Sequence, residues 1–181
     1  MPSWVTYVLV GFGVLLIVAG ALVGGWLFYQ RQVRRAVVRL FSAREAVQSA
    51  ASALENVLDH LSAADDETLT AFASDLNQED RRALHEISLK MRIVGEDLAG
   101  LPLPKAAWPT ATLLERAAFR ICEEAGRVGD LTDPVAVLEA LAAVDTATVR
   151  QVRKTADDEL DVLRERYGVE DTAVYGGGLY I

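Results

Sequence analysis

Two histidines, one cysteine and several acidic pairs are the side chains of this 181-residue chain whose types could carry chemistry. His85-Glu86 begins like the zinc-protease motif HExxH, in which two histidines on one helix face bind zinc and the glutamate is a general base. Residues 85–89 read HEISL, so Leu89 stands where the second histidine belongs. His60 and His85 are therefore expected to be surface residues, and no metal site is predicted.

The acidic pairs, the cysteine and the glycine run do not form a recognisable catalytic motif either. Glu123-Glu124 and Asp157-Asp158-Glu159 lack the Glu-x-x-His spacing of di-iron bundles and are expected to be solvated. Cys122 lies on the apolar side of its helix, where a buried, inert thiol is expected. Gly176-Gly177-Gly178 has no following Lys-Ser/Thr, as a phosphate loop would. The chain is therefore predicted not to be an enzyme and to hold no cofactor.

Charged side chains are distributed unevenly along the chain. Residues 1–30 carry none, residues 31–44 carry five arginines and no acid, and residues 45–181 carry 13 basic and all 26 acidic side chains. Nucleic-acid binding needs basic surface that displaces counterions from phosphates, so the acidic body argues against it. No small-molecule substrate is evident from the residues.

The segment from Trp4 to Tyr29 is uncharged over 26 residues and is predicted to be a transmembrane helix. The 22 steps from Trp4 to Trp26 span about 33 Å, close to the ~30 Å hydrocarbon thickness of a bilayer. Trp4, Tyr7, Trp26 and Tyr29 lie at the two ends, where aromatic rings settle at the membrane interface. A cleaved signal peptide fits less well, because no Lys or Arg precedes the apolar run and the run is too long.

Arginines on one side of this segment predict its orientation. The membrane interface at its C-terminal end would carry Arg31, Arg34, Arg35 and Arg39, whereas only the α-amino group flanks its N-terminal end. The positive-inside rule then places the N-terminus outside and residues 30–181 in the cytoplasm, at a bacterial inner membrane. Anionic lipid headgroups would add about 1 kcal/mol of attraction per arginine. Whether the arginines only set the topology or also bind lipid is left open by the sequence.

Two sequence patterns could support self-association. Gly20 and Gly24 have the small-xxx-small spacing that lets membrane helices approach closely. Past the arginines, apolar residues recur with the 4-3 alternation of a coiled coil. This seam could face a second copy of the chain, or it could be the bundle-facing stripe of an ordinary helix. It comprises Val33, Val37, Leu40, Val47, Leu54, Leu58 and Leu61.

The remainder of the chain has helical periodicity and no segment that alternates with period two. The one clear loop, residues 100–110, contains three prolines, and its Trp108 is expected to cover the bundle. Capping signals predict a short helix that is capped within residues 62–67 (SAADDE) and runs through Asp75, and further helices that start at Asn77, at Thr110, after Asp133 and at Asp145 or Thr146, the last ending at Tyr167.

These elements predict an all-α chain in four parts. Residues 1–30 form the transmembrane anchor and residues 31–61 a basic juxtamembrane and stalk helix. Residues 62–167 form the helical bundle, which is expected to be cytoplasmic and antiparallel, with five or six helices. Residues 168–181 form a flexible, Gly-rich apolar tail.

The tail ends in apolar residues, which is unusual for a disordered terminus. Tyr175, Leu179 and Ile181 could fold back and complete the bundle core. Alternatively, the tail could bind a partner by strand addition, with capture of the C-terminal carboxylate. The residues of that partner-binding tail would be Tyr175, Leu179, Tyr180 and Ile181.

The favoured functional hypothesis is a non-enzymatic, single-pass, membrane-anchored scaffold or interaction protein, such as an accessory subunit of a membrane complex. The alternative is a membrane-associated regulatory or sensor component, and a third hypothesis is an enzyme with an unrecognised site in the bundle core. A bilayer with anionic headgroups and a protein partner, or a second copy of the chain, are the expected partners.

Overall fold

The structure is a computed structural model that describes the backbone of residues 3–167 and the side chains of Phe12, Gly13 and residues 15–167. It contains six α-helices and, within this described range, no strand, which confirms the all-α class. A short 3₁₀ helix, Lys105–Ala107, lies between α3 and α4. The α-helices are α1 (Ser3–Ser62), α2 (Asp66–Ser74), α3 (Glu79–Gly100), α4 (Trp108–Gly129), α5 (Pro134–Ala142) and α6 (Thr146–Tyr167).

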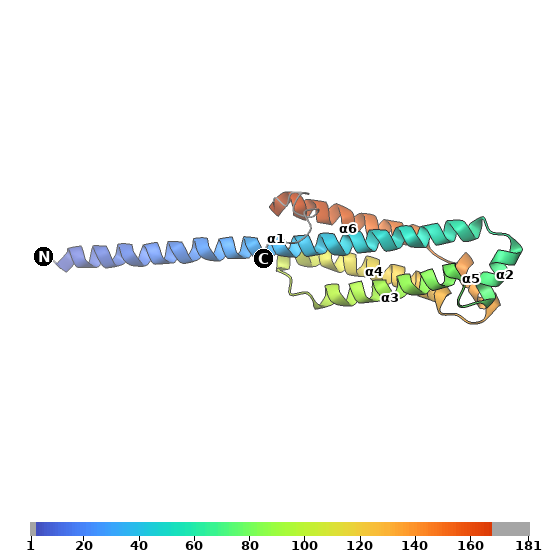
Figure 1. The fold of residues 1–181 in the computed structure, drawn as a ribbon. Helices are drawn as coiled ribbons and strands as arrows, with labels where there is room; N and C mark the ends of the chain where they lie inside the picture. The colour runs from blue at the N-terminus through green and yellow to red at the C-terminus, as the bar shows by residue number, and fades with distance from the viewer. Residues whose placement is uncertain (1–2, 168–181) are drawn as a thin grey trace.

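Four long helices form the body of the molecule (Figure 1). Helices α1, α3, α4 and α6 run side by side with alternating direction, and α2 and α5 pack together across one end. The N-terminal half of α1 projects beyond the other end. We call the end at which α1 joins the bundle the proximal end, and the end closed by α2 and α5 the distal end.

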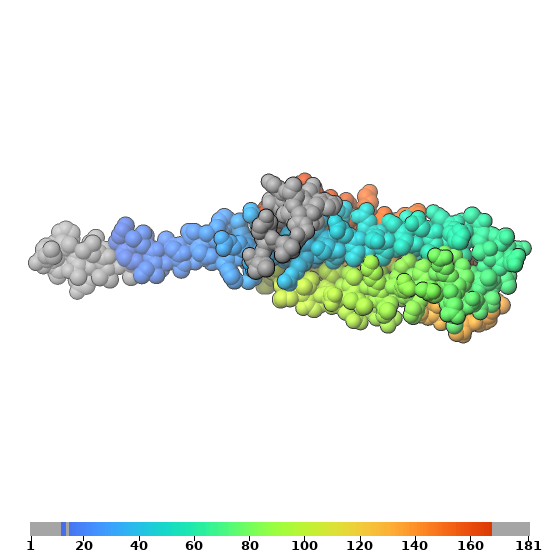
Figure 2. Space-filling model, viewed as in Figure 1, coloured from blue at the N-terminus to red at the C-terminus, as the bar shows by residue number. Residues whose placement is uncertain are grey.

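Helix α1 is unbroken over 60 residues and about 90 Å. The coloured atoms of its first half project from the bundle as a narrow rod, while its second half packs in the bundle (Figure 2). Among the residues with described side chains, no helix has an apolar stretch long enough to cross a membrane. The transmembrane part of the expected fold is thus not supported by the structure and stays a prediction.

The apolar seam of α1 is buried by helices of the same chain. Leu58 is half-buried, and the other seam residues are at most 2% exposed: Val33, Val37, Leu40, Val47, Leu54 and Leu61. Helices α3, α4 and α6 all contact α1. The seam is therefore a bundle-facing stripe, and residues 33–61 belong to the bundle rather than to a separate stalk.

The helix starts follow local capping chemistry. Asp65 caps α2 by accepting a hydrogen bond from the Thr68 backbone N–H at 2.9 Å, and Asp133 caps α5. Two expected starts differ from the structure. Gln78 rather than Asn77 caps α3, and α4 begins at Trp108 because Pro109 fits the first turn, where no N–H is needed.

Helices α3 and α4 approach each other closely at glycines. A Cβ added at Gly95 would lie 2.8 Å from the Phe119 ring, and one at Gly129 would lie 3.1 Å from the His85 backbone nitrogen. Neither glycine could carry a side chain unless the facing residue moved. The two helices thus form a tight antiparallel hairpin that the shorter elements and α1 pack against.

Candidate functional site

The two histidines lie at the distal end in pairs with aspartates. His60 Nδ1 lies 2.9 Å from Asp80 Oδ2, and His85 Nδ1 lies 2.8 Å from Asp130 Oδ1. Both histidine side chains are more than 60% exposed. No group of three or more histidine, cysteine or acidic residues within the described part of the chain is arranged to hold a metal ion. Each pair links α3 to a neighbouring element, which is a structural role.

Cys122 is buried between α3 and α4, as expected from its position on the apolar side of the helix. Its Sγ lies 3.5 Å from Ser88 Oγ, and the Ser88 hydroxyl donates a hydrogen bond to the Cys122 carbonyl at 3.1 Å. The thiol is thus packed within the tight hairpin.

Glu124 was expected on a solvated face, but its side chain is fully buried. Its Oε2 accepts a hydrogen bond from the Asp145 backbone N–H at 3.3 Å. Arg120 lies 2.9 Å from Oε1 and Arg127 lies 3.3 Å from Oε2. The carboxylate therefore fastens the start of α6 to α4. The sequence could have indicated this burial through helical spacing, because Glu124 follows Ile121 by three residues and so continues the same apolar stripe.

Arg81 is a buried cation that sequence reasoning missed. It is 1% exposed, its Nη2 donates to the carbonyls of Gly129 and Leu131, and its Cζ lies 5.5 Å from the Phe72 ring centroid. Burial lowers its pKa, and the Asp130 carboxylate opposes that shift. Arg81 joins α3 to the chain that follows α4.

A hollow of about 430 Å³ lies beside Arg81 at the distal end. Arg82 adds a second cation to its wall, but Glu86 and Asp130 add two carboxylates. The opposite charges offset each other, so the hollow has no evident preference for an anion or a cation. It is therefore a weak candidate for a binding site.

The four arginines that follow the uncharged segment lie around the proximal end. Arg31, Arg34, Arg35 and Arg39 are exposed on α1, between residues of the buried stripe. Arg34 Nε donates a hydrogen bond to the Tyr167 carbonyl at 3.1 Å, which ties α1 to the last residue of α6. Arg35 and Arg39 form no ion pair or hydrogen bond with any residue that the structure describes.

A second hollow, which we call the proximal hollow, lies between α1 and the α3–α4 loop. It has a volume of about 250 Å³ and no acidic residue in its wall. Its wall contains two positively charged side chains, those of Arg35 and Arg39, which lie one helical turn apart. The other lining residues are Gln32, Ala36, Pro102, Leu103 and Pro104.

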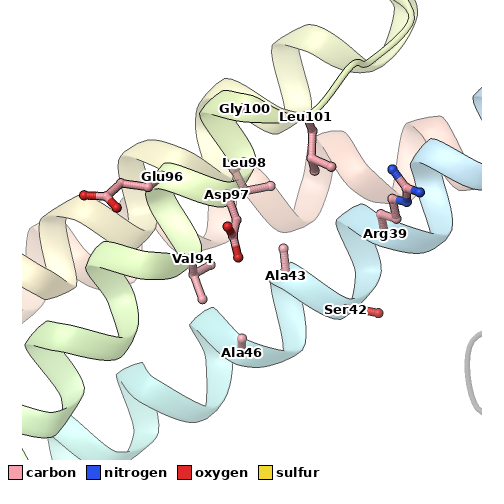
Figure 3. A pocket seen from close by; sticks show the side chains of 10 residues that line it. All are labelled: Arg39, Ser42, Ala43, Ala46, Val94, Glu96, Asp97, Leu98, Gly100 and Leu101. Atoms are coloured by element: carbon pink, nitrogen blue, oxygen red, sulfur yellow. The ribbon is translucent and has the colours of Figure 1, made fainter.

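A larger groove of about 520 Å³ continues from Arg39 along α1 and α3 (Figure 3). Its apolar wall consists of small or aliphatic side chains, among them Ala43, Val94 and Leu98. Figure 3 shows Asp97 pointing toward α1, whereas Glu96 points away from it. The groove therefore carries the opposite charges of Arg39 and Asp97, whereas the wall of the proximal hollow carries only positive charges.

Trp108 does not cover the bundle as expected. Its side chain is 56% exposed, and its Nε1 donates a hydrogen bond to the Leu103 carbonyl at 2.9 Å. This bond holds the ring against the loop that forms one wall of the proximal hollow. Exposed Lys105 lies in the same loop. Trp108, at the start of α4, thus adds an aromatic ring to the proximal end, and Lys105 adds a cation.

The projecting part of α1 leaves its apolar side chains uncovered. Trp26 is 59% exposed and Tyr29 is 43% exposed, while the side chains of Trp4 and Tyr7 lie outside the described residues. A Cβ added at Gly20 or Gly24 would meet nothing within 4 Å. Helix association through this glycine face is therefore sterically open and stays a prediction.

The expected partner-binding residues of the tail, Tyr175, Leu179, Tyr180 and Ile181, lie outside the described residues. Of the surfaces that the described residues form, the proximal end combines unpaired arginines, a hollow and an exposed tryptophan. Comparison of the chain with protein-family models, curated proteins and solved structures gave no match.

Proposed function

We propose that this chain is a non-enzymatic, single-pass membrane protein that holds a helical bundle against the cytoplasmic face of a bacterial inner membrane, as a scaffold for a protein partner. The observation that carries the proposal is the continuity of α1. Only three residues separate Tyr29, the last aromatic residue of the uncharged segment, from the buried Val33. At 1.5 Å per residue this gap is about 6 Å, which is comparable to one headgroup layer.

The exposure of apolar side chains on the projecting part supports an anchor. Leu15, Ile17 and Leu22 are each more than 60% exposed, although large aliphatic side chains gain about 1.5–3 kcal/mol each when they leave water. A bilayer would supply the missing apolar environment. The arginines that begin at Arg31 favour the cytoplasmic side for the bundle.

The described buried polar groups support a scaffold rather than a reaction centre. Arg81 and Glu124 bond to backbone groups of neighbouring elements and so hold helices together. A rigid bundle at a fixed distance from the membrane suits a tether or an accessory subunit. A regulatory or sensor role is the alternative.

Reporter fusions and fractionation test the anchor. A reporter that is active only outside the cytoplasm should be inactive after Ile181, and a cytoplasm-dependent reporter should be active. The full chain should remain in the membrane pellet after alkaline extraction, and a variant without residues 4–29 should be released. An intact chain in the soluble fraction would overturn the anchor.

Purification in mild detergent tests the scaffold. A stoichiometric protein partner should remain with the full chain and be lost from a variant without the bundle, residues 33–167. Recovery that depends on lipid composition would favour the sensor alternative. A full chain that purifies as a monomer with no partner would contradict both.

A further inference from the structure

We propose that the proximal hollow binds the headgroup of an anionic phospholipid, with Arg35 and Arg39 holding its phosphate. This inference rests on the proposed anchor, because only an anchored chain presents the hollow to a bilayer. The hollow would fix the bundle against the membrane surface rather than leave it to swing on α1.

The height of the hollow above the apolar segment suits a headgroup. Arg35 and Arg39 follow Tyr29 by six and ten residues, or by about 9 Å and 15 Å along the helix. Side chains of an α-helix lean toward its N-terminus, which in α1 is the direction of the anchor. Arginine side chains extend their charged ends toward the interface in the same manner. The Arg35 guanidinium group can therefore reach back to the phosphate layer, and Arg39 lies one helical turn above it on the same face of α1.

The chemistry of the wall selects a phosphate. Guanidinium groups donate paired, charge-assisted hydrogen bonds to phosphate oxygens. Arg35 and Arg39 form no hydrogen bond or ion pair with described residues, whereas Arg44, five residues further along α1, lies 2.6 Å from Asp157. Two cations without an acid in the wall create a local positive potential.

The same wall favours an anionic lipid over a zwitterionic one. A choline group would bring a third cation against Arg35 and Arg39, whereas glycerol would bring hydroxyl groups that Gln32 can hydrogen-bond. Pro102, Leu103 and Pro104 provide an apolar side for the glycerol backbone and the start of the acyl chains.

The loop residues beside the hollow match an interfacial position. Trp108 is exposed although it is large and aromatic, and tryptophan concentrates at membrane–water interfaces. Lys105 adds attraction to an anionic surface. The hollow and its neighbours thus present one surface toward the anchor side of the bundle.

Lipid retention by the full chain tests the proposal. The protein is released from nanodiscs that contain equal amounts of phosphatidylglycerol and phosphatidylcholine, and retained lipids are identified by native mass spectrometry. The wild type should retain phosphatidylglycerol preferentially. Arg35→Gln with Arg39→Gln should reduce that preference about tenfold, because two charge-assisted contacts are lost.

A matched control removes the same charge elsewhere. Arg82 and Arg92 are exposed on α3 and form no ion pair among the described residues, so Arg82→Gln with Arg92→Gln should retain phosphatidylglycerol as the wild type does. Equal loss in both double variants would overturn the site and indicate a general charge effect. Displacement of the lipid by millimolar inorganic phosphate would also overturn it, because the site would then take free phosphate.

Fractionation separates this proposal from the anchor. The Arg35→Gln, Arg39→Gln variant should stay in the membrane pellet while it loses the lipid preference. A wild-type chain in the pellet without any lipid preference would contradict the hollow alone. A wild-type chain outside the pellet would contradict the anchor.

Discussion

Arg81 illustrates how one side chain can join three parts of the bundle. Its guanidinium bonds to the carbonyls of Gly129 at the end of α4 and of Leu131 beyond it, its stem is buried with α3, and it contacts the Phe72 ring of α2. Arg81 Nε and Nη1 have no hydrogen-bond partner among the described residues. The bonds it does make are therefore important, because a buried polar group left unpaired is costly.

Arg81→Ala is expected to lower the free energy of unfolding of the full chain by about 2–4 kcal/mol, because two carbonyls lose a donor and the buried stem leaves a cavity. Arg82→Ala is the control, since that side chain is exposed, and it should change stability by less than about 0.5 kcal/mol. Both are measured by chemical denaturation in detergent. Equal effects would contradict the assigned role.

Two capping aspartates should contribute a pH-dependent part of the stability. The Thr68 backbone N–H and hydroxyl lower the pKa of Asp65, and the Thr148 hydroxyl and backbone N–H lower the pKa of Asp145. A carboxyl whose pKa is depressed by folding stabilises the fold above its unfolded pKa of about 3.9. This stability is lost as the pH falls through the lower folded pKa.

The melting temperature should therefore fall below about pH 4, and the fall should be shallower in the Asp65→Asn, Asp145→Asn variant, because asparagine caps a helix without titrating. Asp158→Asn removes an exposed carboxyl and serves as the control. Melting curves between pH 2.5 and 7 would check this. If the melting temperature of the double variant fell below pH 4 as steeply as that of the wild type, the caps would not contribute to the pH dependence.

At the scale of elements, the α3–α4 hairpin depends on the absence of a side chain at Gly95. Gly95→Ala should lower the melting temperature: the helix gains up to about 1 kcal/mol of propensity, but overlap with Phe119 costs about 1–3 kcal/mol. Gly100→Ala is a matched control on the same helix, because nothing lies within 4 Å of its added Cβ. Phe119→Leu should partly rescue Gly95→Ala. Equal melting temperatures for both alanine variants would contradict close packing at Gly95.

Much of the element order could be predicted from the sequence because its signals are local. Asp133-Pro134 marks a helix start through a bond within a few residues, and this prediction is confirmed. The cap expected within residues 62–67 is also confirmed, and the structure places it at Asp65. The partner of the α1 seam could not be predicted, because the same 4-3 spacing suits a bundle and a coiled coil.

The burial of charged residues was harder to predict, because a charged side chain was expected to be exposed whatever its position on the helix. Arg81 precedes Leu84 by three residues and continues the stripe that includes Met91 and Leu98. Glu124 likewise continues the stripe of α4. Extending each stripe without regard to residue type would have found both. The proximal hollow had no sequence signal, since it needs residues 32–39 and 102–104 to meet in space.

At the scale of the whole molecule, the continuous α1 transmits any change in its length to the bundle. Seven extra helical residues after Gln30 would move the proximal hollow about 10.5 Å away from the proposed anchor with little rotation. This insertion should abolish preferential retention of phosphatidylglycerol without changing the melting temperature of the bundle.

An insertion of two alanines at the same place separates distance from rotation. It would turn the bundle by about 200° but move it by only about 3 Å. Because a bilayer is uniform about its normal, lipid retention should persist in this variant. Loss of retention in the two-residue variant alone would contradict a site whose ligand is the bilayer.

The tight α3–α4 hairpin also has a kinetic consequence. Its two helices are joined by a short loop, so it can close early, whereas Arg44 must meet Asp157 across 113 residues. At about 5–20 residues per second, a ribosome completes α6 roughly 5–20 s after the end of α1. The apolar stripe of α1 is thus synthesised first and fully buried last. On the nascent chain it stays open to aggregation until the hairpin and α6 have been synthesised.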